Sequence, residues 1–273
     1  MPRTTLPLLI VAAVLVSAML AWWTLSRGIG GEPGAETARH ESLPPFHQLE
    51  IGGSAEVTLL QSDSESIDVE AGRHVRVSAQ VSNGRLRLRA VDRRRWWNRL
   101  FGGRSPSAPH VTLRFRTLDV IDMNGSVKIR ASRLDAQSLR IAASGGSTLA
   151  IEDLRATSLR VDGSGALDAK LGGRVDQQFV SISGAGSYHA DKLIADDATV
   201  NVSGVGDVVV NARKTLRASI SGAGNIEYVG DPKVTEHVSG IGRVRRRGPA
   251  HAAGMQTADI SRGAHTTSVA AVS

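Results

Sequence analysis

The sequence predicts an all-β protein: a single-stranded β-helix, or β-solenoid, of about seven stacked rungs of 18–21 residues, preceded by antiparallel strands. Three observations predict this fold. A Gly-centred signature of the type Ser-Gly-Ala-Gly recurs from residue 124 onwards. Apolar and polar residues alternate on both sides of each copy. Aromatic residues make up only 4% of the chain, which suits the narrow interior of a solenoid.

The signature has a period near twenty residues. Its first glycines lie 18 to 21 residues apart, and we expect each of them to form the corner of one rung. Glycine at a corner permits a positive φ and lets stacked turns approach closely. The predicted corner glycines are Gly125, Gly145, Gly163, Gly184, Gly204, Gly222 and Gly240.

The residues on either side of each corner alternate in polarity. Around Gly204, for example, Val200 and Val202 are apolar and the residue between them is polar. This period of two predicts a strand, a sharp arc and a second strand, each with one face inward. Coils stacked about 4.8 Å apart would align equivalent positions. We therefore expect Ile182, Val202 and Ile220 to contact one another in series.

The last repeat departs from the pattern. Glu236 and Arg246 occupy positions that are mostly apolar in the earlier repeats. Charge at these positions fits the final turn of the stack, where an open edge must not attract further strands. Arg243, Arg245 and Arg247 complete a basic cluster, which we interpret as part of the same edge protection.

Five segments upstream of the repeats alternate in the same way: residues 46–51, 55–60, 66–70, 75–81 and 86–91. Asn83-Gly84 between two of them is a strong hairpin signal. We expect these segments to form antiparallel strands that cap the N-terminal edge of the solenoid. The predicted domain spans residues 46–248 with a basic and aromatic insertion at 92–109, and the tail 249–273 is expected to be disordered.

The N-terminal residues are predicted to lie outside the fold. Residues 6–25 carry no charge, lie between Arg3 and Arg27, and are long enough to cross a bilayer as a helix. We interpret residues 1–27 as a transmembrane signal-anchor, and a cleaved signal peptide is the competing interpretation. Residues 28–45, rich in glycine and proline, are expected to be a flexible linker.

The sequence between residues 46 and 244 resembles the auto-transporter adhesin head GIN domain family. The resemblance opens with Phe46-His-Gln-Leu-Glu-Ile-Gly-Gly-Ser-Ala-Glu-Val and includes the hairpin of residues 75–88. It closes with its most specific stretch, Ile220-Ser-Gly-Ala-Gly-Asn-Ile-Glu-Tyr-Val-Gly-Asp-Pro. It implies a bacterial β-helical domain of largely unknown function, with surface attachment or adhesion suggested by the family name, and it carries no catalytic residues over to this chain.

The segment most suited to binding is the insertion between the hairpin and the repeats. From residue 85 to residue 104 there are eight arginines and one acid. Arginine pairs with phosphate, and tryptophan favours the membrane interface. This pattern predicts contact with anionic lipid or an envelope polysaccharide rather than nucleic acid; alternatively, the rings pack on the solenoid as a satellite cluster. The candidate contact residues are Arg93, Arg94, Arg95, Trp96, Trp97, Arg99 and Phe101.

Signals of catalysis are weak in this sequence. It contains no nucleophile elbow, phosphate loop or dinucleotide fingerprint, and no cysteine. Its eight histidines are scattered without metal-ligand spacing, so we expect no metal and no cofactor. The alternative function is an envelope carbohydrate-active enzyme on a β-helix scaffold, for which the candidate acids are Asp168, Asp176, Asp196 and Asp197.

The sequence therefore predicts a non-catalytic, membrane-tethered module for adhesion, binding or structure at the bacterial envelope. The anchor would lie in the lipid of the inner membrane, and N-terminal positive charge favours the domain on the periplasmic or extracytoplasmic side. Cleavage of a signal peptide would instead give a secreted protein. The oligomeric state and the ligand are left open.

Overall fold

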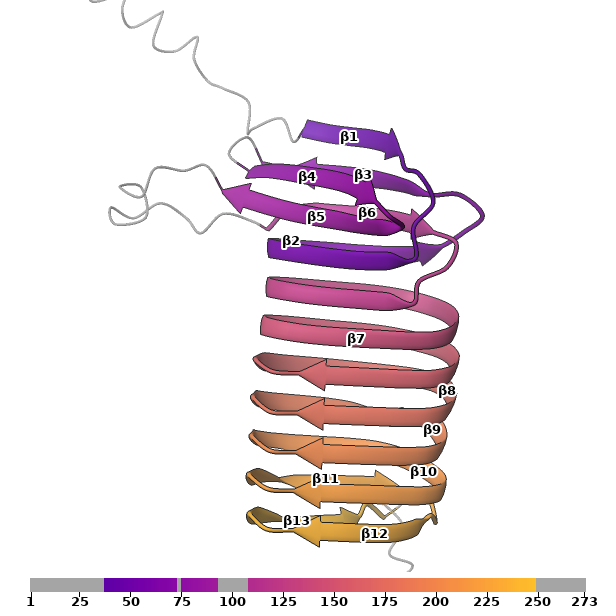
Figure 1. Cartoon of the computed structure of the whole chain (residues 1–273), viewed down its shortest axis with the longest axis vertical. Helices are drawn as coiled ribbons and strands as arrows, with labels where there is room; N and C mark the ends of the chain where they lie inside the picture. The colour runs from indigo at the N-terminus through magenta and orange to yellow at the C-terminus, as the bar shows by residue number, and fades with distance from the viewer. Residues whose placement is uncertain (1–36, 73–74, 93–107, 249–273) are drawn as a thin grey trace, which may run out of the picture.

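The computed structural model describes residues 37–72, 75–92 and 108–248. These residues form thirteen strands and no helix, which confirms the all-β prediction. Figure 1 shows a column of stacked coils with shorter strands at its N-terminal end. Within the described ranges no helix is long and apolar enough to cross a membrane. The predicted anchor at 1–27 and the tail at 249–273 lie outside these ranges.

All thirteen strands belong to one sheet, in which they lie in chain order from β7 to β11, whereas the strands before β7 lie in the order β1-β3-β6-β2 with β5 beside β2 and β4 beside β5. They are β1 (Thr37–Ser42), β2 (Gln48–Gln61), β3 (Ser66–Ala71), β4 (Val75–Ser82), β5 (Arg85–Asp92), β6 (His110–Phe115), β7 (Val120–Gly163), β8 (Ala166–Ile182), β9 (Ala185–Val202), β10 (Val205–Ile220), β11 (Ala223–Val229), β12 (Lys233–Val238) and β13 (Ile241–Arg246).

The repeats form parallel coils that pair in register. Ile182 of β8 pairs with Val202 of β9, and Val202 pairs with Ile220 of β10. All three side chains are at most 1% exposed. Equivalent apolar positions therefore stack from coil to coil into one continuous core, as the alternation predicted.

The number of coils was predicted wrongly: the solenoid has about five turns rather than about seven. Seven glycine corners enclose six intervals, and the last interval is not a continuous coil. It is broken between β11 and β12, where Gly230 has a φ of +102° and is followed by Asp231 and Pro232. β13 then ends the stack at Arg246, so the seventh corner begins no complete turn.

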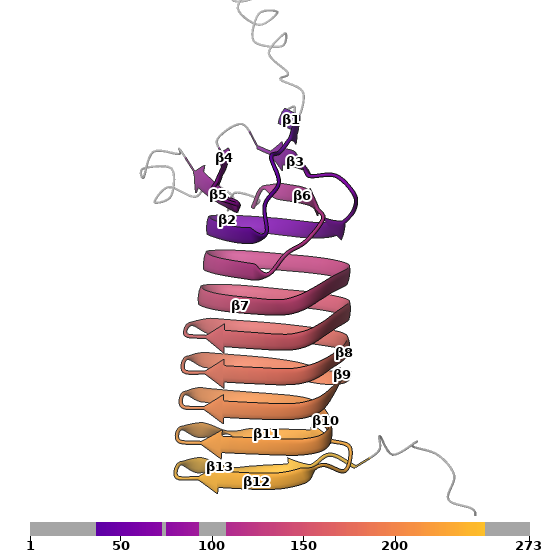
Figure 2. The ribbon, with the colours of Figure 1, turned by 45° about the vertical axis from the view of Figure 1, so that its right-hand side comes forward.

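The N-terminal part is only partly antiparallel. β1, β3 and β6 pair antiparallel, and so do β4 and β5. β2, however, pairs parallel with β5, β6 and β7, with Ile51 beside Met123. Residues 46–60, which we expected in antiparallel strands, thus contain an additional coil with its own corner at Gly53. Turning the molecule by 45° shows β2 lying directly on the coils and the other strands above it (Figure 2).

A column of glycines runs along one corner of the stack. A Cβ placed on Gly204 would lie 1.9 Å from the carbonyl oxygen of Gly184, and one on Gly222 would lie 1.9 Å from that of Gly204. Side chains do not fit at such distances, so only glycine allows the coils to stack here. The column consists of Gly53, Gly125, Gly145, Gly165, Gly184, Gly204, Gly222 and Gly240.

In the third repeat the column passes through Gly165, whereas the sequence analysis placed the corner at Gly163. Gly163 pairs with Ile182 in a core row, and a Cβ on it would meet the side chain of Leu167. Leu167 is 3% exposed. The missing side chain of Gly163 therefore leaves room for this leucine, which fills the core at that level.

The two charged residues of the last repeat lie at the C-terminal end of the stack. Glu236 pairs in register with Ala218 and is exposed. Arg246 pairs in register with Tyr228, and its Nη1 lies 3.4 Å from Oδ1 of Asp231. Both charges thus stand where the apolar rows end, as the edge interpretation requires.

The glycine column gives a direct test. Gly204→Ala should lower the free energy of unfolding by about 3 kcal/mol or more, because the methyl group would overlap a carbonyl of the next coil. Gly146→Ala is the matched control, since nothing lies within 4 Å of a Cβ there. Urea unfolding followed by circular dichroism measures both. Equal stability of the two variants would contradict the close-approach argument.

Candidate functional site

The hairpin of β4 and β5 projects from the N-terminal end of the stack. It closes with Asn83 and Gly84, whose φ values of 52° and 70° match the type I′ turn that Asn-Gly favours. β5 buries Leu86 and Leu88 and pairs with the first coil through β2. The turn and the buried leucines hold the hairpin in place, and the alternate residues of both strands face solvent.

The outward side chains of this hairpin are polar or basic. We call this surface the basic hairpin face. It comprises Arg76, Ser78, Gln80 and Ser82 of β4 and Arg85, Arg87 and Arg89 of β5.

Among the described residues, one carboxylate pairs with the arginines of the basic hairpin face. Glu50 on β2 lies 3.1 Å from Nε of Arg87 and 3.8 Å from Nη1 of Arg85. Within the described ranges Arg76 and Arg89 form no ion pair. Two of the four guanidinium groups thus pair with Glu50 and the other two with no carboxylate of the described residues, which leaves a positive surface suited to an anionic partner.

The predicted contact residues follow this face directly. Val91 is 57% exposed, and Asp92, the last residue of β5, pairs with Val75 of β4. The candidates themselves lie outside the described residues: Arg93, Arg94, Arg95, Trp96, Trp97, Arg99 and Phe101. The structure adds the four arginines of the hairpin to these candidates. Three of them, Arg85, Arg87 and Arg89, belong to the arginine-rich run that the sequence revealed, whereas Arg76 lies outside it.

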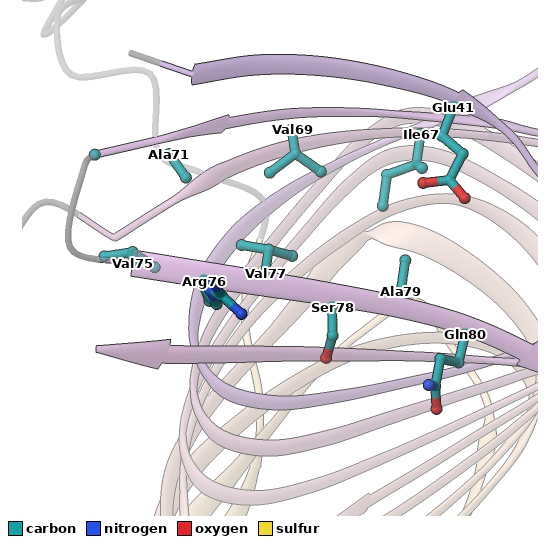
Figure 3. Close-up of a pocket in the computed structure, with 11 residues that line it drawn as sticks. Glu41, Ile67, Val69, Ala71, Val75, Arg76, Val77, Ser78, Ala79 and Gln80 are labelled. Carbon is teal, nitrogen blue, oxygen red and sulfur yellow. The ribbon is translucent and has the colours of Figure 1, made fainter. Parts of the chain in front are cut away.

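A groove of about 500 Å³ lies between β3 and β4, beside the basic hairpin face (Figure 3). Its lining is mixed, and Glu41, Arg76, Ser78 and Gln80 are the polar members. The apolar members are Ile67, Val69, Ala71, Val75, Val77 and Ala79. This groove was not predicted from the sequence, because alternation identifies strands but does not reveal which strand edges stay apart.

Asp68 holds the strands around the floor of the groove. It lies on β3, and its carboxylate is 2.5 Å from Nδ1 of His40 on β1 and 2.5 Å from Nη1 of Arg114 on β6. The hydrogen bond with His40, and then that with Arg114, lower the pKa of Asp68 below its ordinary value of 3.8. The ionised carboxylate thus links three neighbouring strands.

The acids considered for an enzyme do not all lie together, although Asp176 stands between Val175 and Gln177, which pair with Ala195 and Asp197, and so lies in the row of Asp196. Asp168 lies in a different row of the coils from Asp197, which pairs with Gln177. Asp196 lies 2.9 Å from Nζ of Lys214, and this hydrogen bond lowers the pKa of Asp196. A glycosidase acid needs a raised pKa, so this carboxylate is unsuited to that role.

Tyr188 is the buried titratable group of the core. It lies in an inner row, and its hydroxyl is 2.6 Å from Nε2 of Gln178. Burial raises the pKa of Tyr188 above its ordinary value, and the hydrogen bond from Gln178 offsets this only in part. The phenol is enclosed on all sides, so its role is to pack the core and to accept the hydrogen bond of the Gln178 amide N–H, whereas Oε1 of Gln178 is buried without a hydrogen-bond partner among the described residues.

No group of three His, Cys, Asp or Glu side chains that could hold a metal ion occurs in residues 37–72, 75–92 and 108–248. The polar surface of the coils instead makes pairwise contacts along the stack. Lys128 Nζ, for example, lies 2.8 Å from Oε1 of Glu56 on the coil before it. The hairpin and the groove are therefore the places where the described surface departs from the repeating pattern.

Fold and surface together define a parallel β-solenoid with a capping hairpin and a surface suited to binding. A family model described as "Putative auto-transporter adhesin, head GIN domain" matches residues 45–232. The chain belongs to this family. A search of curated proteins found no match.

Solved structures show the same fold. A putative adhesin of Bacteroides fragilis is 22% identical with a TM-score of 0.70, and the match covers 78% of this chain and 97% of that one. A putative adhesin of Parabacteroides distasonis is 20% identical with a TM-score of 0.56, covering 79% and 98%. A putative lipid binding protein of the same organism is 17% identical with a TM-score of 0.54, covering 78% and 98%. At these identities the likeness concerns the fold alone.

The Asp68 contacts predict a pH dependence. The pKa of Asp68 is lower in the folded chain than in the unfolded one, so its carboxylate stabilises the fold above the unfolded pKa. This contribution is lost as the pH falls through the folded pKa. Asp68→Asn should therefore lower the thermal midpoint modestly at pH 7, and the difference from wild type should shrink at pH values below 3.8. Asp168→Asn is the control, and a pH-independent difference at Asp68 would refute the assignment.

Proposed function

We propose that this protein is a non-catalytic binding module of the bacterial envelope. Its residues 1–27 anchor it in the inner membrane, and the solenoid lies in the extracytoplasmic space. The module binds anionic surfaces, either lipid headgroups or an acidic envelope polysaccharide, through the basic hairpin face together with residues 93–101. The observation that carries the proposal is the concentration of four arginines on this hairpin, with Glu50 of β2 as the one carboxylate that pairs with them among the described residues.

The physical basis is electrostatic attraction supported by apolar insertion. A guanidinium pairs with phosphate or carboxylate through two parallel hydrogen bonds. Each basic side chain close to an anionic membrane contributes about 1 kcal/mol of binding. Val91 lies exposed at the end of β5, and the aromatic residues Trp96, Trp97 and Phe101 follow it in the sequence. Apolar groups next to arginines suit the boundary between headgroups and acyl chains.

The comparisons support the class of function without specifying the ligand. Proteins of the same fold are described as putative adhesins, and one is described as a putative lipid binding protein. Adhesion and lipid binding both require an exposed surface with affinity for other surfaces. The basic hairpin face is a part of the described surface that meets this requirement.

Replacing Arg76, Arg87 and Arg89 by serine should weaken binding to anionic vesicles by between about tenfold and a hundredfold. The full-length protein is held in nanodiscs of neutral phosphatidylcholine, so that its anchor is already occupied. Capture of separate phosphatidylglycerol vesicles is then measured, with alginate as the polysaccharide arm. Deleting residues 93–104 should weaken capture further while leaving the circular dichroism spectrum unchanged.

The matched control removes three exposed basic residues at the opposite end of the stack: Arg217, Lys233 and Arg243. This variant should bind like wild type. Capture should also fall as salt rises, since exposed charges are screened. Equal losses in the two triple variants would mean that net charge alone is responsible, and unchanged capture in both would refute the proposal.

A further inference from the structure

The groove between β3 and β4 has two different walls. β3 contributes alternate residues, Ile67, Val69 and Ala71, so one apolar face of this strand forms a floor. β4 contributes six consecutive residues, from Val75 to Gln80. Consecutive residues line a hollow only when it runs along the edge of a strand, where both side-chain faces and the main chain are accessible. Figure 3 shows β4 passing lengthwise beside the floor residues.

The edge of β4 that faces the groove carries main-chain hydrogen-bonding groups. Among the described residues β4 pairs only with β5, on its other edge. In a hairpin with a two-residue turn the flanking Ser82 and Arg85 form a hydrogen-bonded pair, and such pairs alternate along the strands. Val77 and Ala79 are therefore non-hydrogen-bonded positions, whose N–H and C=O groups point away from β5.

Neighbouring contacts agree with this alternation. The Val75 N–H, two residues before Val77, donates to the carbonyl of Gly72 at 2.9 Å and so points toward the β3–β4 connection. On β5 the carbonyl of Ala90 points toward Gly53 of β2, as expected for a residue opposite Val77. The groove thus combines an apolar floor with a row of main-chain donors and acceptors along one side.

We propose that this groove binds an extended peptide segment of a partner protein, which adds to β4 as a further strand. Its main chain would pair with Val77 and Ala79, and every second side chain, small and apolar, would lie on the floor formed by β3. The side chains between them would point outward beside Arg76. An acidic residue at one of these positions matches the charge of Arg76 and of the adjacent Arg89.

A peptide fits this groove better than an acyl chain does. An acyl chain would cover the main-chain groups of β4 without satisfying them, and burial of unsatisfied main-chain groups opposes binding. A strand satisfies them and also fills the floor. The volume of about 500 Å³ lies within the usual range of ligand sites. This inference goes beyond the proposed function, because it concerns the inner edge of the hairpin rather than its outward charges.

The test uses a fluorescein-labelled, acetylated peptide, Thr-Val-Glu-Val-Thr-Val-Thr, and the full-length protein in neutral nanodiscs. Fluorescence anisotropy up to millimolar protein should show saturable binding. A peptide of the same composition with its three valines adjacent should bind at least about tenfold more weakly, because it cannot place them all on the floor. Equal binding of the two peptides would overturn the proposal.

Ala79→Pro removes one donor from the free edge without taking an amide from the β4–β5 pairing. It should weaken peptide binding about tenfold and leave the thermal midpoint unchanged, whereas Ala79→Ser, which keeps the amide, should bind like wild type. Arg76→Glu should weaken binding of this peptide. It should strengthen binding of a second peptide in which lysine replaces the glutamate. Retained binding by Ala79→Pro would exclude strand addition.

Two further outcomes would overturn the proposal by assigning the groove to a different occupant. Saturable binding of a fluorescent hexadecanoate that the peptide does not displace would show a lipid groove. Binding of the peptide only after deletion of residues 93–107 would show that the chain's own segment takes the site. Unchanged capture of phosphatidylglycerol vesicles by Ala79→Pro would show that the anionic-surface function does not depend on the groove. A failure of this inference can then be told apart from a failure of the proposed function.

Discussion

The close approach of main chains at the glycine column is the constraint on which the structure depends. At Gly204 and Gly222 a Cβ would lie only 1.9 Å from a carbonyl oxygen of the preceding coil, and at Gly240 only 2.0 Å. The coils can therefore pair in register only if every one of them brings a glycine to this corner. Because parallel pairing fixes all other rows at the same time, the glycine column also determines which side chains meet in the core.

The same constraint explains how the stack ends. A coil that keeps its corner glycine but carries Glu236 and Arg246 in the core rows still pairs with the coil before it, yet it interrupts two of the apolar rows that a following coil would extend. At the other end, β2 keeps the corner at Gly53, and the strands above it turn antiparallel. The irregular strands of the cap lie where a further coil would lie, and they bury the apolar rows of the first coil.

The coils and their register could be predicted from the alternation and the glycine period, because both reflect local geometry repeated many times. The third corner was misplaced because its Gly-x-Gly pair offers two candidates, and only the stacked neighbours distinguish Gly165 from Gly163. The parallel pairing of β2 was not predicted, because its coil is separated from the others in the sequence and so shows no repeat period. Of the candidate site, the sequence indicated the arginine run, while the groove depends on a strand edge that no local pattern encodes.

This contrast explains why binding is assigned to the cap rather than to the coils. A row of equivalent positions presents similar groups at every level, and many of its charges pair between coils, as Arg245 does with Glu227. Such a surface offers little that distinguishes one ligand from another. The cap is built once, so its four arginines, its single opposing carboxylate at Glu50 and the open edge of β4 occur together at one place. The repeat supplies rigidity and length, and the departures from the repeat supply the surface that can select a partner.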